Sequence, residues 1–199
     1  MTKSKKYNLV AENPQSTVVA EYYKPADRVR EGVSYQSEAD LERAFIKQLE
    51  TQAYEYLPIT SEADLVLNLR KQLEKLNDFT FADSEWERFF ASELANPNQS
   101  IAEKTATIQE NSKKSFILDN GLTKNIDIIK KENIHDNSLQ VINQYTTEDG
   151  QRANRYDVTV LVNGLPLAHI ELKRRGVAIA EAFNQINRYS RESFWAASG

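Results

Sequence analysis

The chain has 199 residues, and 40% of them are hydrophobic, which is enough for a sizeable core and excludes an intrinsically disordered protein. The absence of cysteine excludes a disulfide framework and a thiolate metal site, and two histidines are too few for a His-rich metal centre. The net charge of -4 is unevenly spread, because residues 151–199 hold seven basic and four acidic side chains. This basic part fits a nucleic-acid phosphate backbone, although an ordinary solvated surface explains it equally well.

Residues 1–35 show no sustained periodicity, which predicts an extended lead-in with one short strand at 16–22. Residues 36–112 are predicted to form a helical region that packs on the rest. Ser37 and Asp40 predict the start of a helix that ends near residue 53. Leucines at helical spacing predict a second helix over 62–76. Ser84 and Glu87 resemble a capping box for a third helix that ends before Asn96, and a fourth is expected at 102–109.

Residues 113–199 have the pattern of a core with a β-sheet. Strands are predicted at 115–118, 125–129 and 139–146, with Asn120 and Gly121 as a turn between the first two. A polar loop at 148–154 precedes a β-hairpin at 157–173, and a helix is expected at 178–192. No apolar run approaches the length of a membrane span, so we expect a cytoplasmic protein without membrane contact.

The hairpin DVTVLVNGLPLAHIELK carries the chemistry. Its even positions are apolar and its odd positions mostly polar, which predicts one buried face and one polar face. A two-residue turn at Asn163-Gly164 would place the apolar rows of the two strands on opposite faces. We therefore predict a three-residue connection, with Gly164 in the left-handed region and Leu161 opposite Leu165. Asp157 would then lie opposite His169 and diagonal to Glu171.

Two carboxylates on neighbouring strands are a typical oxygen-ligand set for Mg²⁺, and the residue pattern offers Asp157 and Glu171. Lys173 lies two residues beyond Glu171 and so shares its strand face, where an ammonium can stabilise charge on a phosphate. On the helix predicted from residue 38, Glu38 and Glu42 are candidate outer-shell acids, although a solvated acid is the more frequent case. His169 is interpreted as a neighbour of the site and not as a ligand.

The order of an acid on one strand, Glu171-x-Lys173 on the next and a helix thereafter resembles the PD-(D/E)XK nuclease superfamily. More closely, the chain is similar to the N-terminal region of the R subunit of type I restriction-modification enzymes. The resemblance rests on five segments: SYQSEADLERAF at 34–45, DSEWERFF at 83–90, LQVINQY at 139–145, NRYDVTVLVNGLPLAHIELKRRG at 154–176 and AFNQINRYS at 182–190. Tyr156 stands where the superfamily name has proline.

This resemblance implies an α/β restriction-endonuclease-like fold, with a mixed β-sheet flanked by helices and an additional helical layer. It implies that Asp157 and Glu171 ligate Mg²⁺, that Lys173 is the catalytic lysine, and that Gln185 and Tyr189 support DNA engagement. Neighbouring basic side chains, Arg174, Arg175 and Arg188, are the corresponding candidates for DNA contact.

The resemblance further implies double-stranded DNA as substrate, with the motor region of the same subunit and the methyltransferase (M) and specificity (S) subunits as partners. The motor requires ATP, but the chain has no phosphate-binding loop, so we expect an N-terminal fragment that does not bind ATP and lacks the last strands of the core. Two alternatives stay open: a stand-alone repair or junction nuclease of the same fold, and a non-catalytic DNA-binding or docking module.

Overall fold

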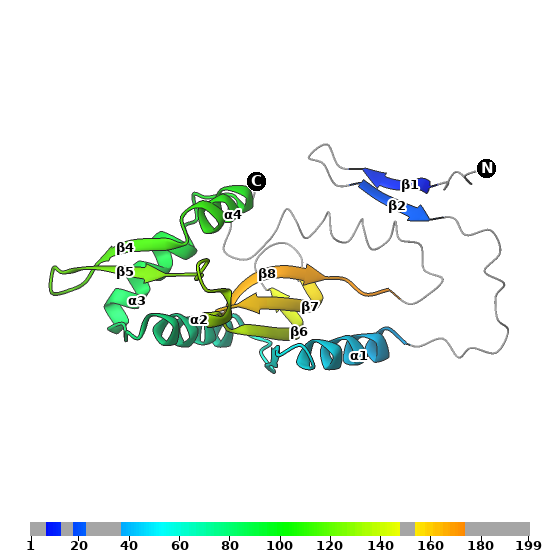
Figure 1. Cartoon of the computed structure of the whole chain (residues 1–199), viewed down its shortest axis with the longest axis horizontal. Helices are drawn as coiled ribbons and strands as arrows, with labels where there is room; N and C mark the ends of the chain where they lie inside the picture. The colour runs from blue at the N-terminus through cyan, green and yellow to red at the C-terminus, as the bar shows by residue number, and fades with distance from the viewer. Residues whose placement is uncertain (1–6, 13–17, 23–36, 148–153, 174–199) are drawn as a thin grey trace.

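The computed structural model describes residues 7–12, 18–22, 37–147 and 154–173, and it has a mixed α/β fold (Figure 1). The central sheet has the order β3-β6-β7-β8, and its strands are β3 (Glu55–Tyr56), β6 (Leu139–Thr147), β7 (Asn154–Val162) and β8 (Leu165–Ile170). β6, β7 and β8 are antiparallel, whereas β3 joins β6 in parallel. A separate hairpin consists of β1 (Tyr7–Glu12) and β2 (Val18–Tyr22). The sequence pattern predicts β2 and β6 to β8 but neither β1 nor β3.

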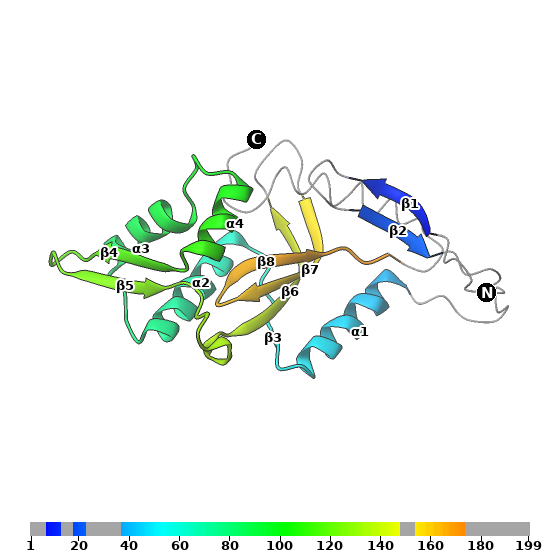
Figure 2. The same cartoon turned by 45° about the horizontal axis from the view of Figure 1, so that its top comes forward.

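Helix α1 (Glu38–Glu50) lies along one face of the central sheet (Figures 1 and 2). Its N-terminus is capped as predicted. The Asp40 amide donates to Ser37 Oγ at 3.1 Å, and the Ser37 amide donates to Asp40 Oδ2 at 3.4 Å. Ile46 and Leu49 of α1 form a buried cluster with Val141 and Val158 of the sheet. Burial of each aliphatic side chain contributes roughly 1.5–3 kcal/mol, so this cluster fixes α1 on the sheet.

The opposite face of the sheet is also buried, which contradicts the predicted polar face of the hairpin. Leu65, from helix α2 (Glu62–Asn77), packs there. Its partners in the cluster are Ile142, Tyr145, Tyr156 and Leu161. A sheet that is covered on both faces needs apolar side chains in both rows, so alternation along one hairpin does not identify a solvent-exposed face.

A second unit packs beside the sheet around an aromatic core. It contains α2, α3 (Asp83–Phe89), a π-helical turn at Phe90–Leu94, α4 (Ile101–Glu110) and the hairpin of β4 (Lys113–Ile117) and β5 (Thr123–Asp127). Phe81, Phe89 and Phe116 lie at its centre, with ring centroids 5.2–6.3 Å apart. The predicted turn between the strands is present, with Gly121 at φ +80°. Contacts between α2 and β5 cross the predicted boundary at residue 112, and that division of the chain stays a prediction.

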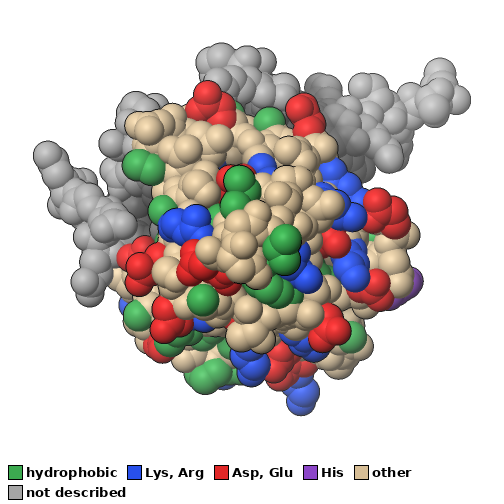
Figure 3. All heavy atoms as spheres, turned by 90° about the vertical axis from the view of Figure 1, so that its left-hand side faces the viewer, with side chains coloured by type: hydrophobic (Ala, Val, Ile, Leu, Met, Phe, Trp, Pro, Cys, Tyr) green, Lys and Arg blue, Asp and Glu red, His purple; other side chains and the backbone are tan. Residues whose placement is uncertain are grey.

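The predicted capping box of Ser84 and Glu87 is wrong. Helix α3 begins two residues earlier, with Ala82 at the N-cap position, and the Glu85 carboxylate accepts from the Ala82 amide at 3.0 Å. Ser84 Oγ instead donates to Asp119 at 2.6 Å, which ties the start of α3 to the β4–β5 hairpin. Figure 3 shows the face at the end of this hairpin, where acidic and basic side chains alternate and hydrophobic ones are scattered singly.

The predicted three-residue connection between β7 and β8 is also wrong. Val162 pairs with Leu165 across a two-residue turn, in which Asn163 and Gly164 have φ values of +51° and +81°. The register shifts further along the hairpin. Leu161 pairs with Pro166 and Val160 with Ala168, so Leu167 of β8 is left without a partner in β7. Proline cannot donate to the ladder, so a bulge beside it costs little. The left-handed Gly164 is as predicted, but the extra residue lies in β8 and not in the turn.

Candidate active site

Asp157 lies near the start of β7 and reaches across to the end of β8. Its Oδ2 accepts a hydrogen bond from the Leu172 amide at 2.8 Å. Val158 pairs with Ile170. Asp157 precedes Val158 and Glu171 follows Ile170, so both acids lie just beyond this pair, at the same end of the hairpin. This end lies beside the N-terminal end of α1 (Figures 1 and 2). The predicted opposition of Asp157 and His169 is wrong, because His169 pairs with Thr159.

The side chain of Glu171 is only 3% exposed, and the residue as a whole is half-buried. Its Oε1 lies 2.5 Å from Lys173 Nζ. Burial raises the pKa of Glu171 and the nearby charge of Asp157 raises it further, while Lys173 acts in the opposite direction. The carboxylates of Asp157 and Glu171 thus lie near one ammonium, that of Lys173, so the negative charges outnumber the positive one.

Burial by itself would lower the pKa of Lys173, but its bond to Glu171 and the negative charges of Glu171, Glu38 and Asp157 outweigh that effect and raise the pKa. The lysine is therefore held as a cation at neutral pH. The structure thus brings Asp157, Glu171 and Lys173 together, as the sequence predicts.

The two acids of α1 take different positions. Glu38 lies close enough to Lys173 for its charge to stabilise the ammonium. Glu42 is buried and accepts hydrogen bonds from Asn143 Nδ2, at 2.5 Å, and from Gln144 Nε2. Its carboxylate is thus engaged by β6, and its outer-shell role stays a prediction.

His169 packs on the sheet. Its ring stacks on Tyr156 with centroids 4.2 Å apart, and its Nδ1 lies 2.9 Å from Thr159 Oγ1. Burial lowers the pKa of His169 to about 4, so the ring is neutral at physiological pH. A stacked, neutral imidazole has a packing role here, and Tyr156 supplies the ring on which it stacks.

Asn143 and Gln144 are functional candidates that the sequence interpretation missed. They interrupt the apolar run of β6 directly beside Tyr145, and Gln144 has φ +53°, which is rare for a residue other than glycine. The signal in the sequence was two adjacent amides inside a buried strand, where polar groups need partners. Their partner, Glu42, is about 100 residues away along the chain.

The donor set is compatible with a hard divalent cation. Among the described residues no group of three or more His, Asp or Glu side chains is arranged to hold a metal. Mg²⁺ commonly uses one or two carboxylates and completes its shell with water and substrate phosphate, so the pair Asp157 and Glu171 suffices. The other predicted site residues lie outside the described part of the chain: Arg174, Arg175, Gln185, Arg188 and Tyr189.

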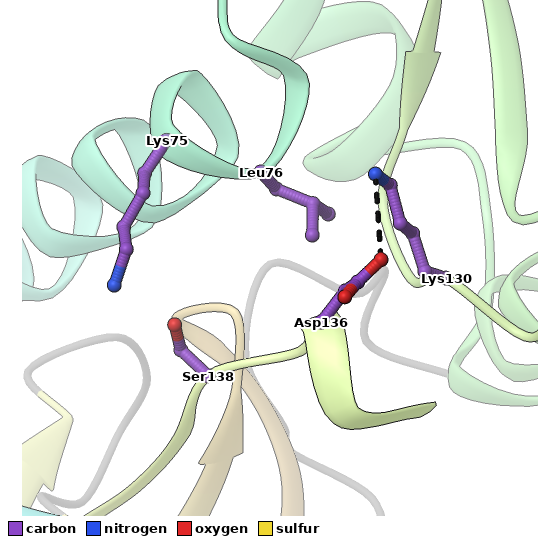
Figure 4. Close-up of a pocket in the computed structure, with 5 residues that line it drawn as sticks. All are labelled: Lys75, Leu76, Lys130, Asp136 and Ser138. Atoms are coloured by element: carbon purple, nitrogen blue, oxygen red, sulfur yellow. Dashed lines mark ion pairs between the residues drawn. The ribbon is translucent and has the colours of Figure 1, made fainter. Parts of the chain in front are cut away.

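A pocket of about 250 Å³ lies elsewhere, at the C-terminal end of α2 (Figure 4). Its lining consists of Lys75, Leu76, Lys130, Asp136 and Ser138. Lys130 Nζ and Asp136 Oδ2 form an ion pair at 3.8 Å. The Ser138 amide donates to Asn163 in the hairpin turn, so the pocket lies at the opposite end of β7 from Asp157. It is therefore separate from the carboxylate pair.

Comparisons with known proteins identify the family of the chain. The family described as "Type I restriction enzyme R protein N terminus" matches residues 35–198. The EcoprrI type I restriction enzyme endonuclease subunit of Escherichia coli is 47% identical over 178 residues, which cover 89% of this chain and 56% of that protein. The SsaAORF53P endonuclease subunit of Staphylococcus saprophyticus is 36% identical over 165 residues, or 80% of this chain.

The chain spans just over half of the Escherichia coli relative and 17% of the staphylococcal relatives, which include an endonuclease subunit of Staphylococcus aureus that is 35% identical. No helix in the described residues is long and apolar enough to cross a membrane. The family match includes the whole hairpin and α1, which carry the candidate site. The chain belongs to the family formed by the N-terminal region of the type I restriction enzyme R protein.

Proposed function

We propose that this chain is the Mg²⁺-dependent endonuclease region of a type I restriction enzyme R subunit, with a PD-(D/E)XK nuclease core. The observation that carries the proposal is the convergence of Asp157, Glu171 and Lys173 at one end of the β7–β8 hairpin. The proposed substrate is double-stranded DNA that lacks protective modification, and the proposed reaction is hydrolysis of a phosphodiester bond.

Each side chain has a role that follows from its surroundings. Asp157 and Glu171 would hold the cation, which supplies an activated water and offsets negative charge on the phosphate. Lys173 remains protonated, so its ammonium can donate to a phosphate oxygen on which charge develops. The Leu172 amide, just beyond the end of β8, orients Asp157. The low exposure of the Glu171 side chain reduces screening by solvent and thereby strengthens its interaction with a charged partner.

The proposal extends to the rest of the enzyme. DNA delivery and ATP hydrolysis belong to the motor region of the same subunit, and the M and S subunits complete the complex in the cytoplasm. Arg174, Arg175, Gln185, Arg188 and Tyr189 are proposed to contact the DNA. Their positive and hydrogen-bonding groups follow the hairpin in sequence, as expected for a phosphate-binding surface.

Titration of this chain with Mn²⁺ tests the metal site directly by calorimetry. We expect binding in the wild type and a loss of at least about tenfold in affinity for Asp157→Ala and for Glu171→Ala. Glu132→Ala, at an exposed position on the loop before β6, is the matched control and should leave the affinity unchanged. A well-folded wild type without bound Mn²⁺ would favour a non-catalytic docking module instead.

A cleavage assay in the assembled restriction enzyme separates chemistry from translocation. Asp157→Ala, Glu171→Ala and Lys173→Ala should each abolish DNA cleavage while ATP hydrolysis continues. Unchanged cleavage by all three variants would reject the assignment. Cleavage by this chain alone, without ATP or partner subunits, would support the alternative of a stand-alone nuclease.

A further inference from the structure

The backbone of β6 is distorted directly beside Asp157. Asn143 pairs with Val158, and Tyr145 pairs with Tyr156, but the ladder omits the intervening pair of Gln144 and Asp157. Gln144 has φ +53°, a left-handed conformation that costs a non-glycine residue about 1 kcal/mol or more. Such a distortion persists only where surrounding contacts hold it in place.

The distortion changes which faces the side chains occupy. Tyr156 and Val158 are two residues apart and would share a face in a regular strand. Instead Tyr156 belongs to the cluster under Leu65 of α2, while Val158 belongs to the cluster under α1. The alternation therefore breaks at Asp157. Its carboxylate accepts from the Leu172 amide, just beyond the end of β8, which is the orientation that brings it to Glu171.

Glu42 supplies the contacts that hold this distortion. It is 8% exposed, and its two carboxylate oxygens accept separately from Asn143 Nδ2 and Gln144 Nε2. Gln144 Oε1 in turn accepts from Arg155 Nε, and Asn143 Oδ1 accepts from the Tyr56 hydroxyl at 2.8 Å. Bonds to a charged acceptor are roughly twice as strong as neutral ones, and a buried carboxylate cannot forgo them without a large desolvation penalty.

We infer that Glu42 is a positioning residue: through the amides of Asn143 and Gln144 it holds the left-handed backbone of β6, and this fixes the direction of the Asp157 carboxylate. The inference rests on the proposed function, because it assigns Glu42 a task toward the metal site without making it a ligand. Helix α1 thus sets the geometry of the site through the side chains of β6, by a route that does not require contact of Glu42 with the cation.

The test is a double-mutant cycle on this chain, read by Mn²⁺ affinity in calorimetry and by thermal unfolding in circular dichroism. If Glu42 acts through Gln144, Glu42→Ala and Gln144→Ala should each weaken Mn²⁺ binding by about tenfold, and the double variant should lose little more. Glu50→Ala, at an exposed position at the end of the same helix, should leave binding unchanged. Non-additive losses in folded variants support the inference.

Three results overturn it. Weaker binding in Glu42→Ala with unchanged binding in Gln144→Ala would make Glu42 a direct ligand. Unchanged Mn²⁺ affinity in both variants, with only a lower melting temperature, would mean that the hydrogen bonds of Glu42 stabilise the fold and do not position Asp157. Fully additive losses would mean that the two residues act separately.

If the alanine variants do not fold, Glu42→Gln and Gln144→Gly replace them. The first keeps one acceptor oxygen, and the second keeps the left-handed backbone accessible while removing the amide. The same pattern of outcomes then applies. Failure of the proposed function looks different, because Asp157→Ala would then leave Mn²⁺ binding unchanged or the wild type would bind none.

Discussion

Replacement of Gly164 by alanine should destabilise the protein far more than the same replacement at Gly121. Both glycines lie in hairpin turns with nearly equal φ values, +81° and +80°. A Cβ at residue 164 would lie 2.6 Å from Leu69 Cα and 3.0 Å from Leu69 N, whereas a Cβ at residue 121 would meet nothing within 4 Å. Since the conformational cost is the same at both sites, the difference measures how closely the β7–β8 turn packs on α2.

The magnitude follows from two contributions. The left-handed conformation costs alanine about 1 kcal/mol, so Gly121→Ala should lower the free energy of unfolding by about that amount. At Gly164 the clash is with helix backbone, which cannot rotate away, and overpacking adds roughly 1–3 kcal/mol. Together these contributions lower the free energy of unfolding of Gly164→Ala by about 2–4 kcal/mol. For a chain of this length 1 kcal/mol corresponds to roughly 2–4 °C, so Gly164→Ala should lower the melting temperature by about 4–16 °C.

Urea unfolding followed by circular dichroism measures both variants on one scale. Equal slopes of the transitions are required for the comparison, because a changed slope would indicate a different unfolded or native state. Losses that agree within about 0.5 kcal/mol between the two variants would refute the reasoning, since the turn would then yield to an added methyl group.

Three further predictions follow from described contacts. Lys173→Ala should retain or tighten Mn²⁺ binding in calorimetry, because it removes a positive charge that engages Glu171, and weaker binding would contradict this. Asn163→Gly should lower the free energy of unfolding, measured in urea, by about 2–3 kcal/mol. The reason is that the Asn163 side chain is buried and forms hydrogen bonds with Ser138, Ile128 and Asn137. A decrease below about 0.5 kcal/mol would contradict the importance of these bonds. Lys104→Met should raise the melting temperature by about 2–4 °C, because Lys104 Nζ is buried and has no hydrogen-bond partner among the described residues, and burial lowers its pKa. A lower melting temperature would contradict this.

The sequence predicted the elements that have strong local signals. The leucine spacing from Leu65 to Leu76 identified α2 to within one residue, and the cap at Ser37 identified the start of α1, because both signals act within a few residues. Helix α1 ends at Glu50, three residues before the predicted end. The parallel strand β3 has only two residues and exists through pairing with β6, so no local pattern marks it. The predicted helix cap at Ser84 is wrong because the Ser84 hydroxyl bonds instead to Asp119, which is distant in the sequence.

The sequence predicted the three residues of the candidate site but not the residues that hold them in place. Asp157 lies on β7, and Glu171 and Lys173 directly follow β8, so one hairpin brings the three groups to the same place. The irregular register changed the residues that lie opposite one another without separating these groups. The bulge depends on Pro166, which the alternation rule ignores. The contact of Glu42 with Gln144 joins residues 102 positions apart and depends on a left-handed backbone that the side-chain pattern does not reveal.

The parallel pairing of β3 with β6 also bears on how the protein forms during synthesis. Glu55 and Gln140 are neighbours in the sheet although 85 residues separate them along the chain. Closure of so long a loop is slow, and β3 emerges from the ribosome well before its partner strand β6. Until Leu139 and the residues after it are made, Ile46 and Leu49 of α1 have no strand to cover, so growing chains of intermediate length should depend on chaperones.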